Sequence, residues 1–361
     1  MQIGIVGLPL SGKTTLFNAL TGQQEATGFS TGKKEKHLAI VKVPDERLDQ
    51  LHTLVPEARQ VNTTIEYIDL AGVEKGSGKS GFDAQFLADL RSTDALLMVI
   101  RAFENDAVPH HNDQIDAERD FTEISDEFLL SDLAIVENRL ERLDKQKRKI
   151  KDDKLEVEEK LLKQCIACLE EGQPLRTLDF SSDELKMMRG FQFLTLKPLL
   201  VTINTGEEDA ARSNEIALHF REKYAASSIE FIALSAEIEM EIAQLPEEDA
   251  TLFLEDLSIK EPALARMIRY SYKLLGLITF FTFGENEVRS WTIRNGMSAK
   301  QAAGEIHSDM ERGFIRAETV TFDSLYENKS LARCRDAGTL RLEGKDYIVK
   351  DGDVITFRFN V

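Results

Sequence analysis

The feature that most constrains this chain is an eight-residue stretch near its start, residues 7–14, which reads Gly-Leu-Pro-Leu-Ser-Gly-Lys-Thr. This is a complete G-x-x-x-x-G-K-T phosphate loop. It follows the apolar stretch 3–6 and precedes the helical pattern 15–20, which is the strand, loop and helix order that such a loop requires. The sequence therefore predicts an α/β nucleotide-binding domain with a doubly wound, mostly parallel sheet.

The loop supplies most of the candidate nucleotide-binding residues. Its glycines allow backbone N–H groups to turn toward a di- or triphosphate, and the following helix adds its N-terminal dipole. Lys13 would neutralise the β and γ oxygens, while the Thr14 hydroxyl would ligate Mg²⁺. The candidate set here is Leu8, Pro9, Leu10, Ser11, Gly12, Lys13, Thr14 and Thr15.

Two later segments have the pattern of nucleotide switches. A predicted strand over 63–68 ends in Asp69-Leu-Ala-Gly72, the D-x-x-G pattern, in which Asp69 would hold Mg²⁺ through water and the Gly72 N–H would sense the γ-phosphate. Between the two motifs, the polar loop 28–32 precedes a predicted strand over 37–42. Thr31 in that loop is the third candidate magnesium ligand, on a weaker pattern.

A residue that orients the attacking water has to come from outside the second switch. Position 73 is Val, where a Ras-type switch would place a Gln. His110, on the loop after the predicted fourth strand 95–100, is the candidate catalytic residue, because a neutral imidazole can order or deprotonate a water. From these residues alone, an exposed loop histidine without a catalytic role fits equally well.

Base recognition is expected from loops at the carboxyl ends of later strands. The predicted strand 197–203 runs into Asn204-Thr205-Gly-Glu207, which departs from the N-K-x-D of guanine-specific GTPases. Thr205 has no long stem to lie along the base, and Glu207 is one methylene longer than Asp, so the sequence argues against guanine specificity. After a further predicted strand, 228–234, Ser235 and Ala236 could offer backbone groups to the base edge.

The remaining segments predict an insertion and a separate C-terminal module. Apolar residues from Leu133 onward step by three and four, and a second apolar stripe returns at Val157, Leu162, Ile166 and Leu169. This pattern predicts an antiparallel coiled-coil hairpin with a first arm of ~22 residues. The basic run 145–154 at its tip fits a solvated face and an interaction tip equally well. Beyond residue 276, short strands and a helix predict a compact α+β unit; the strands are expected at 277–282, 288–293, 345–349 and 354–359 and the helix at 299–312.

These patterns divide the chain into four stretches. Residues 1–124 form the first part of the nucleotide-binding domain, 125–194 the helical insertion, 195–276 the second part of the nucleotide-binding domain, and 277–361 the C-terminal module.

Composition narrows the choice of partners and compartment. A net charge of −18 argues against broad nucleic-acid binding, so no DNA partner is expected and any RNA contact must be local. No apolar run approaches the ~18 residues of a membrane span, and the chain enters a strand without a signal-like stretch, so no membrane partner is expected. With three cysteines in all, the sequence predicts a reducing, cytoplasmic location, and Cys165-x-x-Cys168 favours buried helix positions over a metal site.

Taken together, these residues resemble the YchF-type, Obg-like ATPases of the translation-factor P-loop GTPase class, over essentially the whole chain. The resemblance rests on the phosphate loop, the D-x-x-G pattern, the stretch 101–106 (Arg-Ala-Phe-Glu-Asn-Asp), the N-x-x-E at Asn204 and Glu207, and the C-terminal stretches 302–307, 313–318 and 357–361. The last three are similar to the family's TGS domain, which implies a ubiquitin-like α+β fold for 277–361.

The resemblance implies a Mg²⁺-dependent ATPase that accepts GTP poorly, binds the ribosome, in particular its large subunit, and acts in translation and stress responses. It also implies ribosomal RNA contact through the hairpin tip and the TGS domain, and it places His110 at the family's catalytic histidine. The chain departs from the family at Ser30, where the family commonly has a Cys, so redox regulation through that position is not implied. Two other classes of function stay open: a GTP-specific Obg-type GTPase, which Thr205 and Glu207 disfavour, and a nucleotide-gated scaffold without hydrolysis.

Overall fold

The computed structural model describes residues 1–22, 37–70, 82–105, 108, 114–149, 152–257, 259 and 261–360. The chain folds as two compact units. The N-terminal unit comprises Met1–Ala39 and Glu66–Leu264, and the C-terminal unit comprises Ile40–Ile65 and Ala265–Val361.

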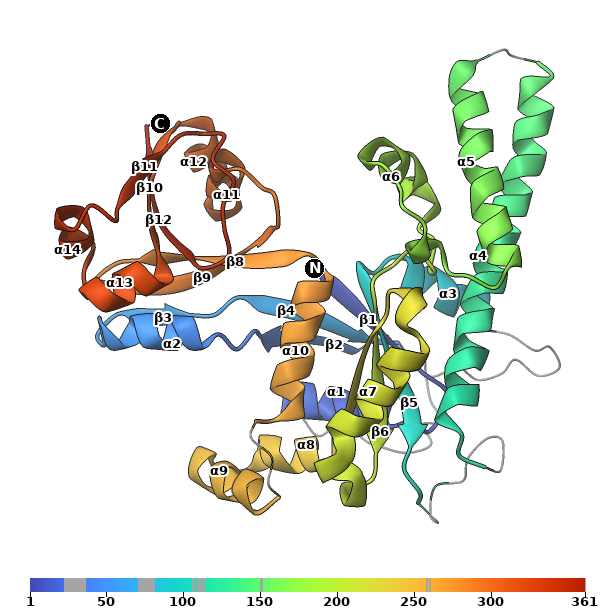
Figure 1. The fold of residues 1–361 in the computed structure, drawn as a ribbon, viewed down its shortest axis with the longest axis horizontal. Coiled ribbons are helices and arrows are strands. Elements are labelled where there is room, and N and C mark those ends of the chain that lie inside the picture. Colours follow the sequence, from blue (N-terminus) through green and yellow to red (C-terminus); the bar gives the residue numbers. More distant parts are fainter. Residues whose placement is uncertain are drawn as a thin grey trace. The chain divides into compact units, whose positions relative to one another are not determined.

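A six-stranded sheet is the centre of the N-terminal unit, with strand order β2-β4-β1-β5-β6-β7 (Figure 1). The pairs β1/β4, β1/β5, β5/β6 and β6/β7 are all parallel. Such strands are covered on both faces; β5 is accordingly an almost continuous apolar run, and β6 is buried along its whole length. The strands are β1 (Gln2–Val6), β2 (His37–Lys42), β4 (Thr64–Asp69), β5 (Ala95–Ala102), β6 (Leu199–Thr205) and β7 (Glu230–Leu234). This arrangement confirms the predicted α/β class.

The helices of this unit follow the strands along the chain. They are α1 (Lys13–Thr21), α3 (Ala84–Arg91), α4 (Ala117–Lys147), α5 (Asp153–Glu170), α6 (Ser182–Met188), α7 (Ser213–Lys223), α8 (Ala236–Gln244) and α9 (Glu247–Asp256), with short 3₁₀ turns η1 (Leu175–Thr177), η2 (Arg189–Phe191), η3 (Glu207–Arg212) and η4 (Ala225–Ser227). Within the described residues, no helix combines the length and the apolarity of a membrane span.

The predicted hairpin is formed by α4 and α5, which extend away from the sheet (Figure 1). Helix α4 is 31 residues long and starts at Ala117, before the predicted boundary at 125. In its first turns, Phe121, Ile124 and Phe128 pack into the core of the sheet, whereas its later turns pack into the core of the hairpin. The periodicity that begins at Leu133 therefore indicated only the hairpin part of the helix.

The seam of the hairpin is close to the predicted one. Val136 and Leu143 pack with Leu162, and a bidentate ion pair from Arg139 to Glu158 at 2.7 and 2.8 Å joins the helices. Val157, expected in the seam, is 52% exposed instead. Both Cys165 and Cys168 are buried on α5, as the sequence predicted, and burial raises the pKa of the Cys165 thiol to about 12.

A buried carboxylate holds the base of the hairpin. Asp132 on α4 accepts hydrogen bonds from the Arg91 guanidinium at 2.7 Å, from the Leu194 and Thr195 backbone N–H groups at 3.1 and 2.7 Å, and from the Thr195 hydroxyl at 2.8 Å. These bonds tie α4 to α3 and to the segment that re-enters the sheet before β6. The buried charge is therefore fully paired, as burial requires.

The C-terminal unit contains a second six-stranded sheet, in the order β11-β10-β12-β8-β9-β3. Its strands are β3 (Arg59–Val61), β8 (Leu277–Phe283), β9 (Glu287–Arg294), β10 (Phe314–Thr321), β11 (Arg341–Glu343) and β12 (Asp353–Phe359), and its helices are α2 (Glu46–Thr53), α10 (Ala263–Leu274, which begins in the other unit), α11 (Ala299–Ile306), α12 (Ser308–Arg312), α13 (Phe322–Asn328) and α14 (Leu331–Asp336). This mixed α+β unit is consistent with the TGS domain that the resemblance implied.

Two details of the C-terminal unit differ from the sequence prediction. The expected strand 345–349 is reduced to an isolated bridge between Ile348 and Ser298. The expected helix 299–312 is two helices, because His307 is extended (φ −162°, ψ 140°) and its Nδ1 accepts a hydrogen bond from the Asp309 N–H at 3.1 Å, which starts α12. The sequence analysis predicted no strand for β10 or β11.

The segment Ile40–Ile65 is the part of the fold that the sequence analysis did not anticipate. Strand β3 pairs in parallel with β9, and Leu48 and Leu51 of α2 are fully buried with apolar side chains of β8 and β9. Arg47 donates to Asp351 at 2.7 Å. The middle of the stretch between the two predicted switches, which forms α2 and β3, therefore folds with the C-terminal sheet.

Candidate functional site

The phosphate loop connects β1 to α1, as predicted, and its glycines are required by close contacts. A Cβ on Gly7 would lie 2.4 Å from the Val99 carbonyl oxygen, and one on Gly12 would lie 2.1 Å from the Asn204 side-chain nitrogen. Gly12 also has φ 91°, in the left-handed region that favours glycine. The backbone of the loop is thus packed directly against the middle of β5 and the end of β6.

Lys13 is folded back onto the loop. Its Nζ donates to the carbonyl oxygens of Gly7 at 3.0 Å and Leu8 at 2.7 Å. Burial lowers the pKa of this ammonium to about 8, and the nearby Asp69 carboxylate opposes the shift. A desolvated cation bound only by two neutral carbonyls is suited to receive an anion.

Thr14 and Asp69, two of the predicted magnesium ligands, lie beside each other. The Thr14 hydroxyl donates to Asp69 Oδ2 at 3.5 Å, while Asp69 Oδ1 is buried and has no hydrogen-bond partner among the described residues. Burial raises the pKa of Asp69, whereas Lys13 lowers it. A hydroxyl and a carboxylate with an unused oxygen are hard ligands of the kind that Mg²⁺ prefers, so these residues fit that ion.

Asn204, one of the predicted base-binding residues, connects the phosphate loop to Ala236. Its Nδ2 donates to the Ser11 carbonyl oxygen at 3.0 Å, and its Oδ1 accepts from the Ala236 N–H at 2.9 Å. Asn204 therefore fixes the phosphate loop and the loop after β7 relative to each other. Ser235 caps α8 through the Ile238 N–H at 3.4 Å.

The other two members of this group differ in exposure. Thr205 is buried and its hydroxyl has no hydrogen-bond partner among the described residues, whereas Glu207 is exposed at the start of η3. The predicted site residues His110, Thr31 and Gly72 lie outside the described residues.

Arg101 is a site-supporting residue that the sequence motifs did not single out. This buried side chain at the end of β5 donates from Nε to the Phe103 carbonyl at 3.1 Å and from Nη2 to the Val108 carbonyl at 2.8 Å. Its guanidinium carbon lies 4.5 Å from the centre of the Phe103 ring, and burial lowers its pKa. An arginine directly after six buried apolar residues was the available signal.

Comparison with known proteins finds family matches in both the N-terminal and the C-terminal parts of the chain. Residues 2–167 match the family model MMR_HSR1, described as 50S ribosome-binding GTPase, and residues 277–360 match YchF-GTPase_C, described as a protein of unknown function (DUF933). The ribosome-binding ATPase YchF of Bacillus subtilis (strain 168) is 43% identical over 366 residues, covering 100% of both chains. The protein of the same name from Escherichia coli O157:H7 is 43% identical over 362 residues, covering 100% of this chain and 99% of the relative.

A solved structure gives the same result for the fold. The Schizosaccharomyces pombe YchF GTPase superposes with a TM-score of 0.87 at 33% identity, covering 99% of this chain and 97% of the other. With sequence and fold agreeing over the full length, this chain belongs to the YchF family.

Proposed function

We propose that this chain is a Mg²⁺-dependent ATPase that associates with the ribosome and acts as a nucleotide switch in translation or the stress response. The observation that carries the proposal is the buried Lys13 beside the Thr14–Asp69 pair, at the end of a phosphate loop. We infer the association with the ribosome from the full-length relatives, which are named ribosome-binding ATPases. We place this activity in the cytoplasm.

The division of labour follows the predicted domains. Stretches 1–124 and 195–276 bind and hydrolyse the nucleotide, 125–194 forms the hairpin, and 277–361 is a ubiquitin-like TGS module. In the structure, the last of these also includes the segment Ile40–Ile65.

Each site residue has a proposed part in the reaction. On nucleotide binding, the Lys13 ammonium gives up its hydrogen bonds to the Gly7 and Leu8 carbonyls and binds phosphate oxygens, whose negative charge it neutralises. Thr14, Asp69 and Thr31 hold Mg²⁺, which when bound supplies further charge neutralisation on the phosphates. The Gly72 N–H responds to the γ-phosphate, and His110 orders the attacking water.

The hairpin tip is the proposed contact for RNA of the large subunit, together with the TGS module. Several of its cations are already paired: Lys145 with Glu141 and Arg148 with Asp144, both at 2.6 Å. These pairs are exposed, and such pairs are worth only about 0–1 kcal/mol, so phosphates can replace their carboxylates at little cost. Lys149 and Lys154 are exposed, with no ion pair in the described part of the chain.

The site is expected to bind ATP more tightly than GTP. Residues 204–207 lack both the lysine stem and the aspartate of a guanine site, and each missing hydrogen bond costs about 1–3 kcal/mol, or about 5- to 150-fold in affinity. Calorimetric titration of ATP and GTP, each with Mg²⁺ and with and without ribosomes, measures the difference and tests the proposed function. GTP binding as tight as ATP binding would contradict the prediction and favour the Obg-type alternative.

A second variant tests the same preference for ATP over GTP by restoring the guanine-site pattern. The double substitution T205K/E207D restores the N-K-x-D pattern and is expected to narrow or invert the preference by raising GTP affinity. The control substitution Glu237→Asp shortens a nearby acidic side chain outside the pattern and should leave the ratio unchanged.

ATP affinity is expected to fall as the pH rises above about 8. The pKa of Lys13 is about 8 in the free protein because burial disfavours the ammonium, and a bound phosphate favours the ammonium and raises that pKa. Above the free-protein pKa, binding has to take up a proton, so affinity drops about tenfold between about pH 7 and about pH 9. Calorimetry in two buffers of different ionisation enthalpy detects this proton uptake, and affinity without pH dependence or uptake would show that Lys13 is not the phosphate ligand.

A further inference from the structure

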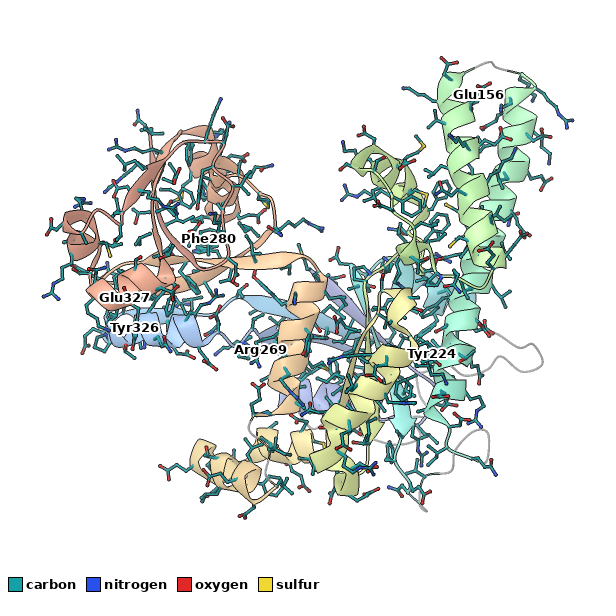
Figure 2. All side chains as sticks on the ribbon, in the orientation of Figure 1. Glu156, Tyr224, Arg269, Phe280, Tyr326 and Glu327 are labelled. Atoms are coloured by element: carbon teal, nitrogen blue, oxygen red, sulfur yellow. The ribbon has the colours of Figure 1, made fainter. Side chains whose placement is uncertain are left out.

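A cavity of about 220 Å³ lies at the base of the hairpin, inside the N-terminal unit. Its walls come from the first turns of α4, the link between α5 and η1, the start of β6, and the end of α7, where Tyr224 is marked in Figure 2. Six apolar or aromatic side chains form much of the lining: Phe121, Phe128, Leu129, Leu199, Tyr224 and Ile229. The rings of Phe121 and Tyr224 contact each other and Phe231, and the ring of Phe128 contacts Phe82, so the walls are well packed.

Arg176 is the single cationic residue in this lining. Its Nε donates to the Lys197 carbonyl oxygen at 3.0 Å, and its two Nη nitrogens have no hydrogen-bond or ion-pair partner among the described residues. Asp132 acts on Arg176 only from a distance, because its own oxygens bond to Arg91, Leu194 and Thr195. Burial accordingly lowers the pKa of Arg176 to about 10. Arg176 is half-buried, and its two free Nη donors are available to pair with an anion in the cavity.

We propose that this cavity binds a small apolar carboxylate, whose two oxygens pair with the free Nη donors of Arg176 and whose body packs on the aromatic wall. The planar guanidinium fork matches a carboxylate in geometry. The ligand carries one negative charge rather than two, because the lining holds no second cation and includes the carboxylate of Asp126. At about 220 Å³ the cavity is smaller than the ~300–1,000 Å³ of drug-sized sites, so the ligand is fragment-sized.

This site is separate from the nucleotide site and does not rest on the proposed function. Leu199 in the cavity wall begins β6, whereas Asn204 lies near its other end, five residues or about 16 Å away at the rise of a strand. Because α4, the link that follows α5 and the start of β6 all contribute to the walls, a bound carboxylate stiffens the base of the hairpin.

The test uses the full chain saturated with Mg²⁺ and ATP, so that the nucleotide site is filled. Binding of 3-phenylpropionate and of its uncharged analogue 3-phenylpropan-1-ol is measured by ligand-detected NMR and calorimetry. We expect saturable binding of the acid, with the alcohol weaker by about 10- to 150-fold, the worth of hydrogen bonds to a charged group. Equal binding of the two compounds, or no saturable binding of the acid, would overturn the proposal.

Three variants locate the site. Arg176→Gln should reduce acid binding to the level of the alcohol, and Ser125→Phe should fill the cavity and abolish binding of both compounds while keeping the arginine. Arg189→Gln, the same substitution at an exposed arginine outside the cavity, should change neither. Should Arg176→Gln fail to fold, Ser125→Phe decides alone, and undiminished acid binding in that folded variant would contradict the proposal.

Discussion

Replacing Lys13 with alanine is expected to lower ATP affinity by about 30- to 5,000-fold. Truncating one partner of a buried, hydrogen-bonded charge pair costs about 2–5 kcal/mol, much of which is the penalty of leaving the phosphate charge unpaired. In the free protein the substitution removes two hydrogen bonds to the Gly7 and Leu8 carbonyls, which destabilises the fold. It also removes a buried cation, whose desolvation disfavours folding and lowers the pKa of Lys13 to about 8, so the two effects oppose each other. The fold is therefore expected to survive the change.

Equilibrium titration with a fluorescent ATP analogue measures the affinity, and circular dichroism with thermal melting checks the fold. Lys300→Ala, which removes an exposed lysine on α11, serves as the control and should match the unmodified protein. Unchanged ATP affinity in a folded Lys13→Ala variant would rule out the assignment of residues 7–14 as the phosphate site.

Replacing His110 with alanine is expected to lower ATP turnover by about 10²–10⁴-fold while leaving ATP affinity nearly unchanged. A positioned acid–base or water-ordering group contributes a factor of that order. The prediction rests on the sequence: Val73 cannot hydrogen-bond a water, so the attacking water needs another partner, and the family resemblance places its catalytic histidine at His110. Arg101 bonds to the carbonyls of Phe103 and Val108, two described residues on the N-terminal side of this histidine.

The assay should follow a single turnover of bound ATP, since basal hydrolysis in such switches is slow and contaminating ATPases distort multiple-turnover rates. His111→Ala removes the adjacent histidine and is the control, with turnover expected to stay within a few-fold of the unmodified protein. If His110→Ala hydrolyses bound ATP at the unmodified rate, His110 is a loop residue without a catalytic role, and the scaffold alternative is favoured.

The part of the site that could be predicted from the sequence is the part set by local pattern. The phosphate loop, the strand ending at Asp69 and the strand ending at Asn204 each have their own signature, and the rule that parallel strands present their carboxyl ends together predicts that they meet. The Thr14–Asp69 contact is such a meeting. What could not be predicted is how the side chains satisfy one another: that Asn204 bonds both Ser11 and Ala236, or that burial weakens the basicity of Lys13.

The same distinction holds for the fold. The hairpin was predictable from its own periodicity, but its true start was not, because Phe121 and Phe128 face the sheet rather than the partner helix. Strand β3 is three residues long and too short to show a period of two, and its partner β9 is more than two hundred residues away. No pattern within a single sequence connects two such segments.

The membership of Ile40–Ile65 in the C-terminal unit sets an order of events during synthesis. A growing chain emerges from its N-terminus at about 5–20 residues per second, so β3 and the apolar face of α2 wait about 10–50 s before β8 and β9 exist to cover them. During that interval the core around Leu48 and Leu51 is incomplete, because β8 and β9 have not yet been synthesised. The strand, loop and helix of the phosphate site lie within the first 22 residues and have already been synthesised. A message truncated before the codon of Leu277 would therefore yield a chain that contains the phosphate loop but lacks the strands that cover Leu48 and Leu51, a form exposed to proteases and aggregation.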